Sequence, residues 1–230
     1  VVLNNLYKQT QLQDTFGMNM VALIDNQPKL CNLKDLLEIF LEHRREVVTR
    51  RTVFDLRKAR ERGHVLEGLA VALANIDEFI ETIKTSPTPP VAKAALMSKS
   101  WDSSLVREML VRAAGETPGG RDAFRPEGLD RGLGMQADGL YRLSDEQASE
   151  ILQMRLQRLT GLEQDKIITE YKEVMARIAD LLDILAQPAR VTAIIGDELA
   201  AVKQEFGQTK LGARRSEIVH NALDLATEDL

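Results

Sequence analysis

The chain is poor in cysteine and aromatic residues, and it contains no long apolar run. The single cysteine, Cys31, excludes an internal disulfide framework and favours a reducing compartment. Aromatic residues make up 4% and glycine contributes 14 of 230 residues, which favours helices over a sheet-rich fold. No stretch approaches the ~18 apolar residues of a membrane-spanning helix, and a secretory signal pattern is absent. Because the chain begins at Val1 without a methionine, we expect a piece of a larger protein.

Residues with the spacing of a known catalytic or metal site are also missing. His43, His64 and His220 are not at metal-ligand spacing, and we expect each to be packed or solvent-facing. Neither a phosphate-binding Gly-x-x-x-x-Gly-Lys-Ser/Thr loop nor a Gly-x-Ser-x-Gly motif occurs. The sequence therefore predicts no catalytic residue, no metal site and no cofactor site within the chain, and an autonomous hydrolase has no supporting site.

Positive charge is concentrated in one segment of an acidic chain. The formal net charge of −5 argues against a globally basic nucleic-acid binder. Residues 43–62 nevertheless contain eight Lys or Arg against three acids, a local net charge of +5, which leaves −10 for the remaining residues. A local basic patch is therefore compatible with the overall charge.

The N-terminal part predicts a short helix, a β-hairpin and a very long helix. Residues 3–13 have a helical pattern, and alternating apolar residues over 16–32 surround the turn signal Asp25-Asn-Gln-Pro28. Asn32 is a good N-cap, and a helical period then continues without proline over 33–84. A helix of that length would extend ~78 Å at 1.5 Å per residue, so it needs a partner helix, as in a coiled coil.

The remaining residues predict a small head followed by a returning helix. The short elements of the head are helices over 91–98 and 103–114, a glycine-rich loop over 115–134, a strand within 137–144 and a helix over 144–159. Ser144 and Gln147 form a capping box at the start of that last helix. A second long helical pattern covers 162–206 and is interrupted at Gln187-Pro188, since proline can begin a new helix.

The predicted fold class is mainly α: long antiparallel coiled-coil arms with a small globular helical head, and a short β-hairpin at the base. The predicted parts are a base segment with a helix and the hairpin (1–32), an ascending arm (33–86), a globular dimerisation head (87–161), a returning arm (162–206) and a C-terminal segment leading to a missing domain (207–230).

The basic segment lies partly on the surface through which the arms would pair. Arg44, Arg51 and Lys58 occupy successive positions of one heptad series on the apolar stripe of the helix. One interpretation is that these cations pair with acids on the returning arm: Asp183, Asp197 and Glu198. The other is that the base of the arm docks on another domain or on phosphates. Periodicity leaves both interpretations open.

Three blocks of the chain closely resemble the A subunit of bacterial DNA gyrase, which is a type IIA DNA topoisomerase. They are LNNLYKQTQLQDTFGMNMVAL (3–23), QPKLCNLKDLLEIFLEHRREVVTRRTVFDLRKARERGHVLEGLAVALANID (27–77) and LSDEQASEILQMRLQRLTGLEQDKIITEYKEV (143–174). The loop at 115–134 is the weak part of the resemblance. The paralogous subunit of topoisomerase IV shares the plan, but NMVAL and HRREVVTRRT are more similar to gyrase.

The resemblance implies a mechanical role in an enzyme that passes one DNA duplex through a double-strand break. In that family these segments form the base of a tower-like domain, two arms and a head that dimerises to make the exit gate for DNA. The implied partners are a second copy, double-stranded DNA and the gyrase B subunit, which brings ATP and Mg for negative supercoiling. The implied location is the cytoplasm, in association with the chromosome.

The nucleophilic tyrosine of the family follows an arginine, and this chain has no such pair. Leu6, Leu140 and Glu170 precede the three tyrosines, so we expect the chain to be inactive by itself. A function from another class stays open as the alternative: a free-standing coiled-coil adaptor that binds a protein partner.

Candidate functional residues follow from the pattern and the resemblance together. Arg45 and Arg50 point away from the pairing stripe and are the candidates for contacting DNA or the catalytic body, whereas Arg44, Arg51 and Lys58 are candidate anchors of the arm's base. The dimer-interface candidates are Ile151, Leu152, Arg155, Leu156 and Leu159, and the alternative for them is that they fill the head's own core. The hinge candidates are Gly63, Gly68 and Pro188, since a gate must open while it stays attached.

Overall fold

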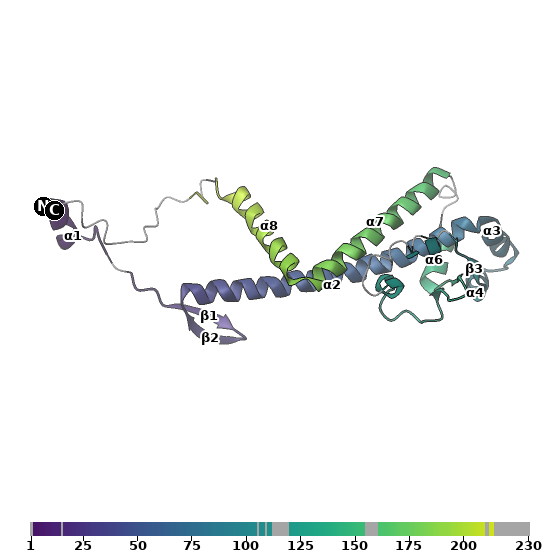
Figure 1. Cartoon of the computed structure of the whole chain (residues 1–230), viewed down its shortest axis with the longest axis horizontal. Coiled ribbons are helices and arrows are strands. Elements are labelled where there is room, and N and C mark those ends of the chain that lie inside the picture. The colour runs from purple at the N-terminus through teal and green to yellow at the C-terminus, as the bar shows by residue number, and fades with distance from the viewer. Residues whose placement is uncertain are drawn as a thin grey trace. The chain divides into compact units, whose positions relative to one another are not determined.

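The computed structural model describes residues 2–14, 16–104, 106–108, 110–111, 120–154, 161–209 and 212–213 (Figure 1). The chain divides into two compact units, Val1–Val48 with Thr192–Leu230 and Thr49–Val191, and each is described by itself. Most of the described residues are helical, which confirms the mainly α fold class. None of the described helices is both long enough and apolar enough to cross a membrane.

The first unit contains the predicted β-hairpin. Helix α1 (Val2–Gln9) precedes strands β1 (Met20–Ile24) and β2 (Gln27–Cys31), which pair antiparallel with Met20 opposite Cys31. Asp25 and Asn26 form the two-residue connection, and both have positive φ, 51° and 61°. Such a connection matches the twist of paired strands, and Asp and Asn tolerate the left-handed region better than most residues. The hairpin prediction is confirmed.

Helix α2 (Leu33–Ala74) begins at the predicted cap. The backbone N–H of Asp35 donates to the side-chain oxygen of Asn32 at 2.9 Å, and the backbone N–H of Asn32 donates to the Asp35 carboxylate at 3.0 Å. The two side chains thereby satisfy donors that the first helical turn would leave without partners.

The predicted continuous helix over 33–84 is wrong, because the chain breaks at Asn75. Helix α2 ends at Ala74, and α3 (Ile76–Thr85) begins after Asn75, which has φ −119° and ψ 33°. The Asn75 side-chain N–H groups donate to the carbonyls of Val71 and Asp102, each at 2.8 Å. A side chain that bonds to backbone carbonyls in this way offers an alternative to a regular helix, and a partner 27 residues away is not visible in a local pattern.

The second unit adds short elements around α3. They are helix α4 (Pro89–Ser98), strand β3 (Trp101–Asp102), a 3-10 helix η1 (Gly120–Phe124), strands β4 (Gly134–Met135) and β5 (Leu140–Arg142), and helix α6 (Asp145–Gln153). The three strands form an antiparallel sheet in the order β3-β5-β4. The predicted capping box is confirmed, since Ser144 and Gln147 bond reciprocally at the start of α6. The core of the unit gathers around Trp101 and Tyr141, which are 1% and 0% exposed.

Two helices follow, with the predicted interruption between them. Helix α7 (Gly161–Ala186) ends before Gln187, and α8 (Pro188–Phe206) has the proline at its first position, as expected. Arg190 pairs with Asp180 at 2.9 Å and with Asp183 at 2.7 Å across the interruption. The pKa of Asp183 is lowered, first through the hydrogen bond from Arg190.

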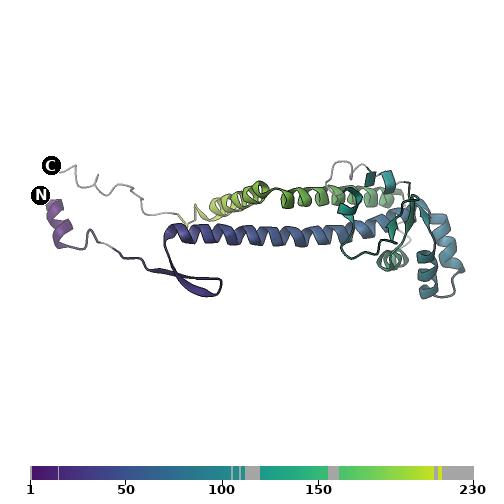
Figure 2. The ribbon, with the colours of Figure 1, turned by 60° about the horizontal axis from the view of Figure 1, so that its bottom comes forward.

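Within the second unit α7 runs antiparallel to α2 (Figure 2). Arg62 pairs with Glu170 at 2.6 Å, while Asp55, earlier on α2, pairs with Arg177, later on α7, at 3.8 Å. Within this unit, the two predicted long helical patterns are therefore antiparallel, as expected.

Gly63 and Gly68 should respond to alanine with opposite signs. A Cβ at Gly63 would meet Val174 and Ile178 at ordinary van der Waals distances of 3.5 and 3.7 Å, whereas one at Gly68 would lie 2.8 Å from Cβ and Cγ of Gln147. Gly63→Ala should raise the free energy of unfolding by about 0.5–1 kcal/mol through helix propensity. Gly68→Ala should lower it by about 1–3 kcal/mol through overpacking. Urea denaturation of both variants measures this, and equal effects would contradict it.

Candidate functional site

The candidate anchors of the basic segment lie on α2, and two cations of that segment pair with acids of the later helices. In the first unit Arg44 forms an ion pair with Glu198, and both side chains are about a third exposed. In the second unit Arg62 pairs with Glu170. Internal pairing as predicted, one of the two interpretations, thus describes Arg44, whose partner Glu198 is one of the three expected acids; Glu170, the partner of Arg62, is not among them.

The other residues of the segment are placed differently. Lys58 pairs with Glu61 of its own helix at 2.8 Å, and this hydrogen bond lowers the pKa of Glu61. Arg45, Arg50 and Arg51 lie on α2 with side chains at least partly open to solvent. Their assignment to DNA, to a catalytic body or to the arm's base stays a prediction.

The dimer-interface candidates are described in part. Ile151 is 4% exposed and belongs to the core of the second unit, and Leu152 is partly buried against it. This supports the alternative for Ile151, that it fills the head's own core. Helix α6 ends at Gln153, before the expected Leu159, and Arg155, Leu156 and Leu159 lie outside the described residues. Both described candidates also line an apolar cavity of about 280 Å³ with Phe79.

The hinge candidates occupy two kinds of position. Gly63 and Gly68 are buried inside α2, which is helical through both of them. At Gly68 the reason for glycine is the close approach of Gln147 from α6. Pro188 begins α8 directly after the interruption at Gln187. Whether bending is localised at any of the three stays a prediction.

A polar cluster inside the second unit is the most organised group of side chains that the structure adds to these candidates. The Glu67 carboxylate on α2 accepts a hydrogen bond from the Tyr141 hydroxyl of β5 at 2.8 Å and one from the Tyr171 hydroxyl of α7 at 2.9 Å. Both tyrosines are 0% exposed. One carboxylate therefore joins three elements that are distant in the sequence.

Gln147 of α6 extends the cluster. Its side-chain nitrogen donates to the Tyr141 hydroxyl and to the carbonyl oxygen of His64, both at 2.6 Å, and lies 3.2 Å from Nδ1 of the His64 ring. The two amide hydrogens go to the Tyr141 hydroxyl and the His64 carbonyl, so the contact with Nδ1 does not fix the position of the ring proton. Nε2 of the ring lies 2.7 Å from the Ser144 hydroxyl. Both ring nitrogens of His64 thus have a polar neighbour inside the protein.

The environment shifts the acid–base behaviour of both titratable groups. Removal of the carboxyl group from water raises the pKa of Glu67 to about 7, although the hydrogen bonds from Tyr141 and Tyr171 act in the opposite direction. Burial lowers the pKa of His64 to about 4, with a smaller contribution from the positive charge of Arg125. Burial, followed by the charge of Glu67, also raises the pKa of both tyrosines well above its ordinary value.

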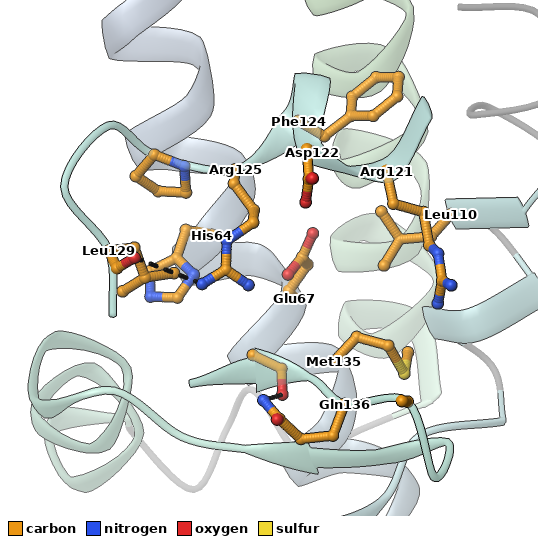
Figure 3. Close-up of a pocket in the computed structure, with 13 residues that line it drawn as sticks. His64, Glu67, Leu110, Arg121, Asp122, Phe124, Arg125, Leu129, Met135 and Gln136 are labelled. Atoms are coloured by element: carbon orange, nitrogen blue, oxygen red, sulfur yellow. Dashed lines mark hydrogen bonds between the residues drawn. The ribbon is translucent and has the colours of Figure 1, made fainter. Parts of the chain in front are cut away.

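A cavity of about 340 Å³ lies beside the cluster, as Figure 3 shows. His64 and Glu67 line it from α2, and Arg125 lies next to His64 on the wall formed by the segment after η1. The Arg125 guanidinium donates to the carbonyls of Asp130 and Leu133 at 2.7 and 3.1 Å, so it holds its own loop together. Its positive charge still acts on the neighbouring groups, since it favours a lower pKa for both His64 and Glu67.

Local sequence patterns do not reveal the cluster, because its partners come from different parts of the chain. The pattern predicts Tyr141 and Tyr171 as packing residues, which their burial agrees with, but it gives Glu67 no role. A signal is present: His64 and Glu67 are polar residues three positions apart in the otherwise mostly apolar run from Gly63 to Ala74. Residues at that spacing share a helix face, and polar groups on a buried face need partners.

The hydrogen bonds of this cluster join elements of the second unit. Within the described ranges no buried side-chain polar atom lacks a partner, and no group of three or more His, Cys, Asp or Glu could hold a metal ion. The Glu67 carboxylate is occupied by the hydroxyls of two buried tyrosines.

Comparison with known proteins relates the chain to one family over most of its length. The family model described as DNA gyrase/topoisomerase IV, A subunit, matches residues 1–200. The chain is 58% identical to the DNA gyrase A subunit of Pseudomonas aeruginosa, 54% to that of Escherichia coli and 53% to that of Neisseria gonorrhoeae, in each case over 100% of the chain. It spans 24%, 25% and 24% of these curated relatives, about a quarter of their length.

The contributions of Glu67 and His64 to the free energy of unfolding should change with pH in opposite directions, so that they offset each other. Glu67 stabilises the fold fully below pH 4.5, its unfolded pKa, and this stabilisation is lost as the pH rises through about 7. His64 stabilises the fold above pH 6.5, and this stabilisation is lost as the pH falls through about 4. Relative to the unmodified chain, Glu67→Gln should gain about 1–3 kcal/mol of unfolding free energy as the pH rises from about 4.5 to 6.5, and His64→Gln should lose a similar amount.

Urea denaturation at a series of pH values measures these differences. Comparing each variant with the unmodified chain removes the titration of the other carboxylates, which is common to all. If the unfolding free energy of each variant changes with pH in parallel with that of the unmodified chain, the pKa values of Glu67 and His64 are not shifted as described.

Proposed function

The chain belongs to the DNA gyrase/topoisomerase IV A-subunit family, and we propose that it forms the coiled-coil arms and the exit-gate head of a gyrase. The head meets the head of a second copy, and the passed DNA duplex leaves between them. The arms keep the gate attached while it opens. The observation that carries the proposal is the match over residues 1–200, together with two antiparallel helices, α2 and α7, that lead into a cluster of short elements.

The proposal extends to the reaction of the whole enzyme. With the rest of the gyrase A subunit, and with the B subunit, which brings ATP and Mg, the chain takes part in ATP-dependent passage of one duplex through another and in negative supercoiling in the cytoplasm. The chain by itself is inactive in this proposal. The burial of Tyr141 and Tyr171 supports the inactivity, since both hydroxyls are engaged with Glu67.

Two alternatives are less well supported. The curated relatives described above are gyrase subunits, which favours gyrase over the equivalent subunit of topoisomerase IV. A free-standing coiled-coil adaptor is disfavoured because each of these relatives matches the entire chain, at 53–58% identity.

Arg45 and Arg50 are the proposed contacts to DNA or to the catalytic body. Both lie on α2 with exposed side chains. Guanidinium groups suit phosphate contacts because they present several donors in a plane. The proposal thus assigns Arg45 and Arg50 to a contacting set, and Arg44, which pairs with Glu198, to an anchoring set.

A substitution in the proposed interface should separate the head dimer. Leu156→Glu would place a charge in a desolvated apolar contact, and we expect the dissociation constant of the dimer to rise about tenfold or more. Light scattering gives the mass in solution, where one chain is 25.7 kDa. Val91→Glu is the matched control, because Val91 is 47% exposed on α4. A folded Leu156→Glu chain that remains a dimer would exclude this face, and a monomeric unmodified chain would contradict the head dimer.

Charge reversal should distinguish the two sets of basic residues. In the full-length gyrase chain, Arg50→Glu should weaken DNA binding more than Arg44→Glu does and should reduce the salt slope of log K by about one. Titration of labelled duplex DNA at several salt concentrations measures both quantities. A larger effect of Arg44→Glu would contradict the division.

A further inference from the structure

The contact between α2 and α7 is mostly apolar. A Cβ at Gly63 would meet only Val174 and Ile178, and the core of the second unit takes Leu56, Ala59, Val65, Met175 and Leu181 from these two helices. Apolar burial is not directional, so a seam of this kind selects one axial position less sharply than a hydrogen bond between buried groups does. Packed helices are known to step past each other by one turn, ~5.4 Å.

The ion pairs along this contact are weak selectors of axial position. Arg62 and Glu170 are 46% and 43% exposed, and Arg177 and Asp55 are 64% and 35% exposed. Exposed pairs on long side chains contribute little to stability, because water competes for both charges. Their side chains can also follow a displacement of the helices.

The Glu67 cluster differs from these exposed ion pairs in its burial, its stiffness and the directionality of its bonds. Tyr171 is rigid and fully buried, and its hydroxyl reaches Glu67 at 2.9 Å. A one-turn step of α7 along α2 would carry this hydroxyl away from the carboxylate. The buried Tyr171 hydroxyl would then lose its acceptor, which is costly, and Glu67 would keep only the bond from Tyr141. The Tyr141 hydroxyl joins the same carboxylate to β5, and it also accepts from Gln147, which extends the connection to α6.

We propose that Glu67, Tyr141 and Tyr171 form a register lock, which selects one axial position of α7 along α2 and ties it to β5 and α6. Buried polar groups in paired helices specify register at a cost in stability, which is the best-attested role of such groups. Glu67 is in this sense a positioning residue. If the proposed gate function holds, the lock also transmits displacement of the arms to the head. This transmitting role rests on the gate function, whereas the selection of one axial position does not.

The test replaces the three residues of the lock by apolar groups and measures the axial position of the helices. The variant Glu67→Met/Tyr141→Phe/Tyr171→Phe removes the carboxylate and both hydroxyls together, and the Gln147 amide, which loses the Tyr141 hydroxyl, keeps its bond to the His64 carbonyl. Spin labels at Arg57→Cys and Glu173→Cys, both exposed positions on α2 and α7, report the distance between the helices in a Cys31→Ser background. We expect a melting temperature within about 4 °C of the unmodified chain or higher. We also expect a second population of distances, because the axial offset between the two labels changes by ~5.4 Å in a one-turn step.

Two controls separate a lock from a general loss of packing. Arg62→Gln/Glu170→Gln removes an exposed pair that joins the same two helices, and it should keep the single distance of the unmodified chain. Glu67→Gln retains a carbonyl oxygen that accepts from one tyrosine and an amide that donates to the other hydroxyl, and it should also keep one distance. If the triple variant does not fold, Tyr171→Phe by itself removes the bond to α7 and carries the same measurement.

The outcomes decide the proposal in both directions. A single, unchanged distance in the triple variant, or in Tyr171→Phe, would overturn the lock, as would an equal second population in the Arg62/Glu170 control. In the full enzyme, assembled with the gyrase B subunit, the triple variant should supercoil DNA about two- to thirtyfold more slowly than the control. Failure of the unmodified enzyme to supercoil would contradict the proposed function and leave the distance result standing.

Discussion

The arrangement of the second unit depends on one partly buried carboxylate that accepts hydrogen bonds from two tyrosine hydroxyls. Placing Glu67 among buried groups raises its pKa to about 7, which means that the fold disfavours its charge. The two hydrogen bonds offset part of that cost, and they can do so only if β5 and α7 lie at one position against α2. Apolar burial supplies most of the stability of such a unit, but this geometric condition decides which packing is adopted.

Gly68, next to the cluster, is required by the close packing that brings these hydrogen-bonding groups together. Gln147 reaches the His64 carbonyl and the Tyr141 hydroxyl only because α6 approaches α2 so closely that a Cβ at Gly68 would be 2.8 Å from its side chain. The capping box of α6 holds that glutamine from the other side, since Ser144 N–H donates to its carbonyl oxygen at 3.0 Å. Gln147 thus serves a local and a long-range purpose with separate atoms, its oxygen in the cap and its nitrogen in the cluster.

Local physics explains what could be predicted from the sequence. The caps at Asn32 and Ser144, the turn at Asp25 and the start of α8 at Pro188 each depend on residues within four positions of one another, so their patterns are visible. The break at Asn75 could not be predicted, because one of its bonds goes to the carbonyl of Asp102. The same holds for the Glu67 cluster, since its tyrosines are 74 and 104 residues away. The long helices conceal such partners, because a single polar residue hardly changes their periodicity.

The apolar seam between α2 and α7 and the few directional hydrogen bonds beside it resist different movements of the helices. A pair of helices held by apolar burial resists separation but can slide, whereas a directional bond between buried groups resists sliding. In α2 the two kinds of contact lie close together, with Gly63 against Val174 one turn before Glu67. A device that must transmit displacement needs this combination: stiffness along each helix, and a fixed position between the helices at the end where the displacement is delivered. The cluster supplies the second property at the point where α2 meets β5 and α6, and the interruptions at Asn75 and Gln187 lie outside it.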